Sequence, residues 1–275
     1  MGVFNLVWGR VFDGIFWLFR SLTPWAGMLW ISFLTGLLML FVFKKTSDQS
    51  GIRRIKDRIK AHLLEIRLFK DNFGLTMRAQ GRILLCNFRY ISYSAKPMLV
   101  MIVPLILMII QLNFWFGYQS LNPDQQALLK VKLDEAVNPL ETAVLLKPDP
   151  SIVMETPPLR IHELHEIDWR FRVQEPGIHR LALTINGRTI VKRVAVAQKP
   201  LAKISPLKTR SGLLQQLLYP GEPPIKGNSP VKSVEISYPS LKMEVFGLGI
   251  HWLIVYFILS VFFGFSLKGV FKVEI

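Results

Sequence analysis

Cysteine is nearly absent from this chain of 275 residues, since Cys86 stands alone. A single cysteine excludes an internal disulfide, so any domain must be held together by side-chain packing. Histidine is also scarce, and the closest pair, His162 and His165, lies among Glu163, Glu166 and Asp168. Two histidines at this spacing would share a metal ion on a helix, but the alternating residues that follow favour a strand. We therefore expect polar surface residues here and no metal site.

The sequence also lacks the signatures of enzymes and pumps. It contains no Ser-His-Asp arrangement, no glycine-rich phosphate loop and no Walker sequence. Its three long apolar runs, residues 25–43, 97–118 and 248–267, contain no Asp, Glu, Lys or Arg. An ion-driven pump or an intramembrane protease needs ionisable side chains inside such runs. We predict a protein that is not an enzyme and that uses no cofactor.

Acidic residues are few: 19 Asp and Glu face 34 Lys and Arg, which gives a formal net charge of +15 in a chain that is 51% hydrophobic. This combination is typical of a membrane protein with a basic cytoplasmic face. A nucleic-acid binder would carry its basic residues on a soluble module with a recognisable reading element, and none is visible. We therefore predict that nucleic acid is not a direct ligand.

The three apolar runs each have about the length that a helix needs to cross a hydrocarbon core about 30 Å thick. Between the first two, residues 44–96 are strongly basic, which places that segment in the cytoplasm by the positive-inside rule. The N-terminus then lies outside, and the tail of residues 268–275 lies in the cytoplasm. We predict three transmembrane helices in the lipid bilayer of a bacterial inner membrane.

Residues 1–22 carry apolar and aromatic side chains at helical spacing, among them Phe12 and Phe16. This pattern predicts an amphipathic helix that lies in the outer membrane interface, with a cleaved or buried segment as the alternative.

The basic segment 44–96 predicts a helical hairpin. Apolar residues from Ile52 onward recur at steps of three and four, a coiled-coil-like stripe, until Asn72-Phe73-Gly74 breaks it, and a second helix follows over residues 75–94. The positive charge of this segment has two explanations. The basic residues form a solvated face that sets the membrane topology, or they contact a ribosome, anionic lipid or a client protein. The residues expected to make such contacts are Arg53, Arg54, Arg58 and Lys60.

Residues 119–246 change character and predict an extracytoplasmic β-sandwich of the immunoglobulin-like kind. Residues 167–173 alternate apolar and charged side chains, and Asn186-Gly187 predicts a hairpin between strands at 179–185 and 188–197. The other expected strands are residues 128–133, 143–146, 159–161 and 234–238. Residues 201–230 predict an irregular connection with one short helix near 211–218.

A resemblance to a known family rests on the second apolar run. Lys96-Pro97-Met98 begins it, Pro104 interrupts it, and Phe114-Trp115 lies near its end. This string, together with the order of the segments around it, resembles the three-span branch of the YidC/Oxa insertase superfamily, which includes archaeal YidC-like proteins and the third subunit of the ER membrane protein complex. The resemblance covers the chain except the β-rich insert. It implies a membrane insertase or chaperone whose three helices enclose a hydrophilic groove for the transmembrane segments of nascent membrane proteins.

The residues expected at such a groove are Ser32, Thr35, Lys44, Lys45, Lys96 and Met101. Close helix packing through small residues is the simpler interpretation of Ser32, Thr35 and Gly36. Many members of the family carry a positive residue inside the groove, whereas the nearest lysines here are expected at its cytoplasmic rim. The alternative function is a scaffold subunit of an envelope membrane complex, which binds an extracytoplasmic protein partner through the β domain.

Overall fold

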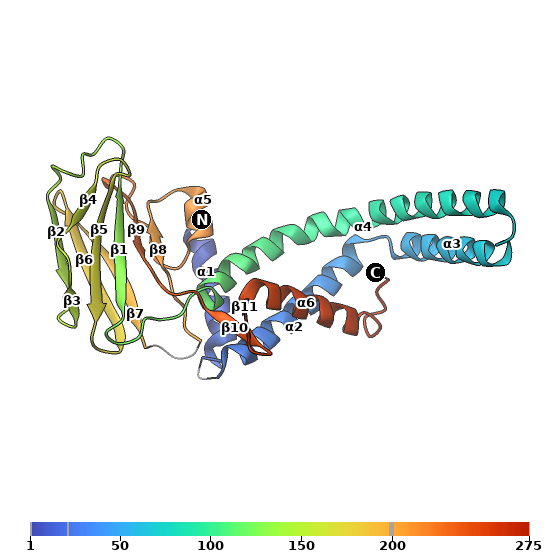
Figure 1. Ribbon diagram of the computed structural model, residues 1–275, viewed down its shortest axis with the longest axis horizontal. Coiled ribbons are helices and arrows are strands. Elements are labelled where there is room, and N and C mark those ends of the chain that lie inside the picture. Colours follow the sequence, from blue (N-terminus) through green and yellow to red (C-terminus); the bar gives the residue numbers. More distant parts are fainter. Residues whose placement is uncertain (1, 21, 198–200, 275) are drawn as a thin grey trace. The chain divides into compact units, whose positions relative to one another are not determined.

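The computed structural model describes residues 2–20, 22–197 and 201–274 (Figure 1). The chain forms two compact units. The first, the β unit, comprises Met1–Gly27 and Ile109–Trp252, and the second, the helical unit, comprises Met28–Met108 and Leu253–Ile275. The helices are α1 (Gly2–Trp17), α2 (Pro24–Thr46), α3 (Gln49–Leu68), α4 (Phe73–Phe116), α5 (Leu213–Leu218) and α6 (Trp252–Leu267).

Two helices, α2 and α4, are long and apolar enough to cross a membrane, and α6 is a shorter apolar helix of 16 residues. The third apolar run was predicted as a helix from residue 248, and this boundary is wrong. Strand β11 (Leu248–His251) pairs instead with β10 (Lys242–Val245). Between these two strands, Phe246 and Gly247 adopt positive φ angles of 50° and 80°. They close a tight hairpin before α6 begins.

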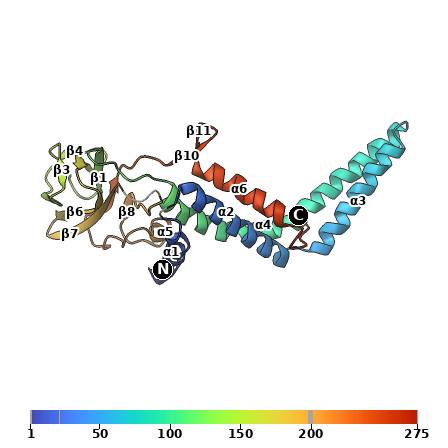
Figure 2. The same cartoon turned by 90° about the horizontal axis from the view of Figure 1, so that it is seen from below.

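Helices α3 and α4 lie side by side and form the predicted helical hairpin (Figures 1 and 2). The Asp48 carboxylate accepts a hydrogen bond from the Gly51 amide at 2.9 Å and caps the start of α3. The Asn72 side chain accepts one from the Leu75 amide at 3.1 Å at the start of α4. These two caps explain why α3 begins after Asp48 and why α4 begins after Asn72, two residues before the predicted start at residue 75.

The helix predicted over residues 75–94 and the apolar run predicted over residues 97–118 are joined in one helix, because α4 has 44 residues with Pro97 and Pro104 inside it. A proline removes one backbone hydrogen bond and usually bends or ends a helix.

The remaining strands form two antiparallel sheets in the β unit. One sheet has the order β3-β5-β1-β9-β8, with β4 also paired to β5, and the other has the order β2-β6-β7. The strands are β1 (Gln126–Leu133), β2 (Val144–Pro148), β3 (Ile152–Met154), β4 (Leu159–Ile161), β5 (Glu166–Val173), β6 (Gly177–Ile185), β7 (Arg188–Val196), β8 (Leu207–Thr209) and β9 (Val231–Ile236). The predicted irregular connection therefore contains a strand, β8, as well as the expected short helix, α5.

Alternation along the strands builds one hydrophobic core from both sheets. In β5, Trp169 and Phe171 are buried while Arg170 between them is exposed. The predicted hairpin at Asn186-Gly187 is confirmed: φ is 50° and 74° at these residues, and β6 pairs with β7 directly across the turn.

Helix α1 has buried apolar side chains on one face, and on the other Arg10 is exposed together with Trp17. Phe12 and Phe16 are buried, and the Phe16 ring lies 4.8 Å from the Trp115 ring, measured between centroids. On the open side, Trp17 and Leu18 are 72% and 67% exposed. The predicted helix is thus present, although residues 1 and 21 of segment 1–22 lie outside the described residues.

Candidate functional site

In the helical unit, Thr35 of α2 lies in a tight contact with α6, and Ser32 lies one turn earlier on α2. Both side chains are fully buried. The Thr35 hydroxyl donates to the Ile31 carbonyl at 2.7 Å and lies 3.0 Å from the Tyr256 hydroxyl of α6. At Gly36, an added Cβ would meet the Phe263 Cβ at 3.0 Å, so no larger side chain fits without a shift of α6. This geometry favours close packing through small residues.

We expect Gly36→Leu to lower the stability of the helical unit by about 1–3 kcal/mol, the usual cost of overpacking a close contact. Thermal unfolding of the purified full chain in detergent measures the effect. Gly264→Leu in α6 is the matched control, because a Cβ at Gly264 meets nothing within 4 Å. Equal melting temperatures for the two variants would contradict the close contact between α2 and α6.

The lysines at the end of α2 lie apart from this contact. The Lys44 ammonium donates to the Phe271 carbonyl at 2.9 Å, and the Lys45 ammonium lies 4.7 Å from the centre of the Phe41 ring. The Glu274 amide donates to the Gln49 side chain at 2.7 Å. The C-terminal segment is thereby held against the junction of α2 and α3.

A small buried cluster closes this end of the helical unit. Leu40, Phe43, Ile52 and Val273 form it, and Met101 packs against it from α4. Lys96 is exposed on α4. The six residues expected at a groove therefore fall in different places: Thr35 lies in the contact with α6, Ser32 is buried on α2, Met101 packs on a core, and the three lysines lie on the surface. The structure does not bring them together on one open cleft, and their role in binding stays a prediction.

Helix α4 has a packed, an apolar and a cationic face within the helical unit, and in its apolar run Leu99 and Val103, 67% and 62% exposed, lie between the last two. Its packed face carries Ala79, Cys86, Pro97 and Met108, which are all buried. A second face carries large apolar side chains that are 45–68% exposed and recur at three- and four-residue steps. On an ideal helix they fall within about 80° of arc and extend over about 33 Å. We call this face the α4 stripe: Leu84, Phe88, Ile91, Met98, Ile102 and Ile106.

Because α4 is continuous, the α4 stripe passes from the hairpin into the apolar run without interruption. Ala95 occupies the intervening position on the same face. The spacing is visible in the sequence, but the predicted helix end at residue 94 and the apolar run from residue 97 divide it between two elements.

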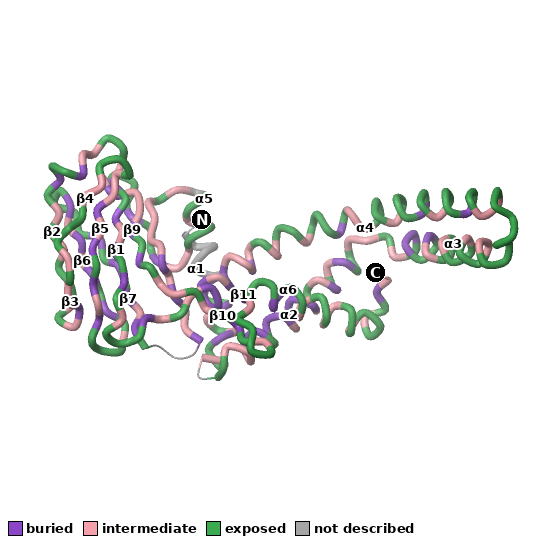
Figure 3. The backbone as a smooth tube through the Cα atoms, viewed as in Figure 1, coloured by how far each residue is buried: buried purple, intermediate pink, exposed green. Residues whose placement is uncertain are grey.

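A third face of α4 is cationic. Arg78, Arg82, Arg89 and Lys96 are exposed and lie about 120–160° around an ideal helix from Leu84. On α3, all four residues expected to contact a client or ribosome are exposed: Arg53, Arg54, Arg58 and Lys60. The hairpin therefore presents exposed apolar side chains on α4 and exposed basic side chains on both helices. Figure 3 shows the backbone of the hairpin coloured mostly exposed or intermediate.

His162 and His165 lie in the turn before β5, with ring centroids 5.9 Å apart. His165 adopts a positive φ of 52°, and its Nδ1 lies 3.4 Å from the Val137 carbonyl oxygen. Among the described residues, no group of three or more His, Cys, Asp or Glu side chains is placed to hold a metal ion.

Comparison with known proteins gives no family assignment. No family model matches the sequence, and no curated protein matches it. Among solved structures, domains 4 and 5 of the S-layer protein SbsC match with a TM-score of 0.23 and 15% sequence identity, over 29% of this chain and 47% of that one. A likeness at this score implies neither a shared fold nor a shared role.

Proposed function

We propose that this chain is a membrane insertase or transmembrane-segment chaperone that binds apolar helices of client proteins. The observation that carries the proposal is the α4 stripe, a continuous row of exposed apolar side chains shared by the hairpin and the apolar run. In the hairpin, which lies outside the bilayer in this proposal, exposed apolar residues such as Leu84, Phe88 and Ile91 mark a binding site for proteins or membranes. The stripe extends over about 33 Å, close to the length of a helix of about 20 residues that spans a bilayer.

The proposed topology has α2, α4 and α6 as membrane spans, with the basic hairpin in the cytoplasm. At 1.5 Å per residue, α6 is about 24 Å long, shorter than an average hydrocarbon core of about 30 Å. A short span thins the bilayer locally. Thinning lowers the cost of moving polar flanks of a client across, which is about 2.5–3.5 kcal/mol per charged residue at mid-membrane. The resemblance to three-span YidC-like proteins supports the same proposal.

In this proposal the two exposed surfaces of the hairpin act in sequence. The cations on α3 and α4 attract acidic groups on a ribosome or a client at long range. The client's apolar helix then docks on the α4 stripe at Phe88, and this contact shields the apolar side of the client helix from water. The client helix next moves along the α4 stripe toward Ile102. Exposed apolar residues of α6, such as Phe257 and Phe262, offer further contacts to a helix in the bilayer.

Site-specific photocrosslinking in cells tests this function. A photoreactive amino acid is placed at Phe88 or at Ile102 on the stripe, and at Arg89 as the neighbouring control on the cationic face. We expect adducts with many nascent membrane proteins from the two stripe positions and few from Arg89. A single stable partner, or no adducts at all, would contradict the proposal. Thr35 is unsuited to this test because its side chain is buried against α6.

A scaffold subunit of an envelope complex is the second candidate. The observation that favours it is a group of exposed leucines around β4: Leu140, Leu159 and Leu164 are 57%, 61% and 53% exposed. The Arg160 guanidinium donates to the Thr142 carbonyl at 2.8 Å and holds the neighbouring loop against this strand. In this candidate function, the β unit is an immunoglobulin-like domain that binds an extracytoplasmic protein partner. It predicts one stable photoadduct from Leu159.

A further inference from the structure

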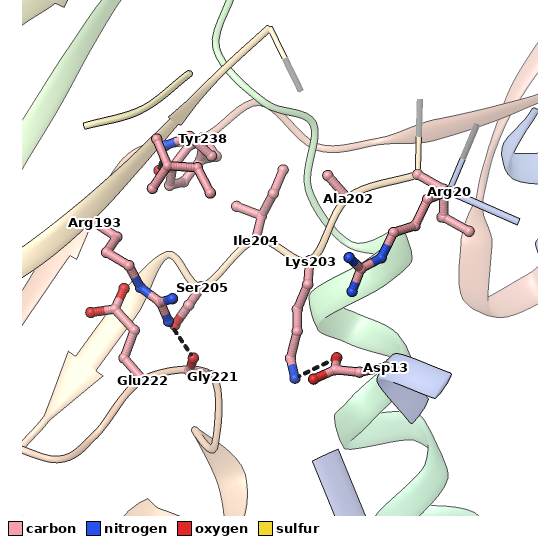
Figure 4. A pocket seen from close by; sticks show the side chains of 13 residues that line it. Asp13, Arg20, Arg193, Ala202, Lys203, Ile204, Ser205, Gly221, Glu222 and Tyr238 are labelled. Atoms are coloured by element: carbon pink, nitrogen blue, oxygen red, sulfur yellow. Dashed lines mark hydrogen bonds and ion pairs between the residues drawn. The ribbon is translucent and has the colours of Figure 1, made fainter. Parts of the chain in front are cut away.

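The β unit contains a cavity of about 500 Å³ that no part of the proposed function uses (Figure 4). Its walls come from the C-terminal half of α1 and the residue Arg20 beyond it, from β6 and β7, and from the segments that follow β7, α5 and β9. Leu201 and Ile204, which follow β7, are buried, and they supply an apolar floor together with Ala195 and Tyr238.

Two arginines reach this cavity from opposite sides, Arg20 from beyond α1 and Arg193 from β7 (Figure 4). The Arg20 guanidinium lies 5.4 Å from the centre of the Trp115 ring, which fixes its position. The Arg193 guanidinium donates to the Gly221 carbonyl at 3.0 Å. Among the residues that the structure describes, neither arginine forms an ion pair with a carboxylate. Each guanidinium has five N–H donors, so both retain donors for a ligand.

The carboxylates that line the cavity are already neutralised by lysines. Asp13 lies 3.0 Å from the Lys203 ammonium. Glu222 lies 2.9 Å from the Lys192 ammonium and 3.9 Å from that of Lys208. The positive charge of Arg20 and Arg193 is therefore left without a counter-charge. A cavity with two such arginines suits an anion, and the planar guanidinium matches the oxygens of a phosphate group in particular.

The apolar surroundings indicate where such a phosphate comes from. Trp17 and Leu18, just before Arg20, are large apolar residues that face outward. Ile178 at the cavity is 61% exposed. Basic residues next to exposed aromatic and aliphatic side chains are the arrangement by which a helix holds lipid headgroups at a membrane surface. We propose that the cavity binds a phosphate group, supplied by the headgroup of an anionic phospholipid. This proposal does not depend on client binding.

Native mass spectrometry of the full chain in detergent tests the site, with phosphatidylglycerol as the probe and inorganic phosphate as the competitor. We expect Arg20→Gln/Arg193→Gln to bind the lipid at least tenfold more weakly than the unsubstituted chain. The control is Arg188→Gln, an exposed arginine on the same strand, β7, that does not line the cavity. This variant should bind the lipid as the unsubstituted chain does.

The competitor separates the two sources of phosphate. Displacement of the lipid by millimolar inorganic phosphate supports recognition of the phosphate group itself, free or lipid-bound, while lack of displacement supports the lipid. Equal lipid binding by the double variant and the unsubstituted chain, or no binding by either, overturns the proposal. If the double variant fails to fold, the single variant Arg193→Gln decides, because this side chain is exposed and its removal leaves the core intact.

Discussion

Glu222→Gln is expected to destabilise the β unit by about 3–5 kcal/mol, the usual cost of removing one partner of a buried ion pair. The side chains of Lys192 and Glu222 are 1% and 3% exposed, and their charged atoms lie 2.9 Å apart. The Lys192 ammonium also donates to the Ser205 carbonyl at 2.7 Å. Without the Glu222 carboxylate, a buried positive charge loses its main counter-charge.

The same variant should show a distinctive pH dependence. Burial lowers the pKa of Lys192, and Glu222 opposes this shift. In Glu222→Gln the pKa falls further, so the unfolded state binds more protons than the folded state between the folded pKa and the unfolded value of about 10.4. Stability rises with pH wherever the unfolded state binds more protons. The deficit at pH 7 should therefore shrink as the pH is raised toward 10.

Denaturant unfolding of the full chain in detergent at pH 7 and at pH 9.5 measures both effects. The matched control is Lys192→Met/Glu222→Leu, which replaces the pair by apolar side chains of similar size and should recover most of the stability. A single variant as stable as the unsubstituted chain would show that the buried pair contributes little. A double variant no more stable than Glu222→Gln would show that the damage does not come from an unpaired Lys192.

Phe88→Glu should reduce client insertion at least tenfold. Phe88 lies at the hairpin end of the α4 stripe and is 68% exposed, so the substitution leaves the folded helix without a buried charge. A client's apolar helix that docks there would have to desolvate the new carboxylate, which costs more than the 1.4 kcal/mol that corresponds to a tenfold loss of affinity. Insertion of a single-span substrate into proteoliposomes, scored by protease protection, measures the effect.

Ala61→Glu on α3 is the matched control for this variant. Ala61 is exposed on the other helix of the hairpin, so the change adds the same charge outside the α4 stripe. It should leave insertion within about twofold of the unsubstituted chain, less than 0.5 kcal/mol of binding free energy. Full insertion activity in Phe88→Glu would show that client insertion does not use the α4 stripe.

Local patterns in the sequence predict the elements whose structure is decided locally. The alternation around Trp169 and Phe171 predicts β5, because apolar side chains on one side of a strand must face the core. Asn186-Gly187 predicts its turn, because both residues tolerate positive φ. The caps Asp48 and Asn72 likewise act on amides three residues away.

Features that depend on distant partners are not predicted. Pro97 indicates a helix end by its local chemistry, yet α4 continues through it, and this continuity creates the α4 stripe. The residues of β11 read as part of an apolar helix until their pairing with β10 is known. Thr35 meets Tyr256, which is 221 positions later in the chain, and Lys192 meets Glu222 across a long connection. The spacing of residues along the sequence predicts neither this buried ion pair nor the cavity that Arg20 and Arg193 line.

The central claim is that the basic hairpin and the β domain lie on opposite sides of a membrane. Cysteine labelling tests it in a Cys86→Ala background, with single cysteines introduced as Arg58→Cys on α3 and Arg188→Cys on β7, both at exposed positions. With a membrane-impermeant maleimide on spheroplasts, Arg188→Cys should be labelled at once, and Arg58→Cys only after the membrane is permeabilised. Labelling of both cysteines in intact spheroplasts, or protection of both, would contradict the claim.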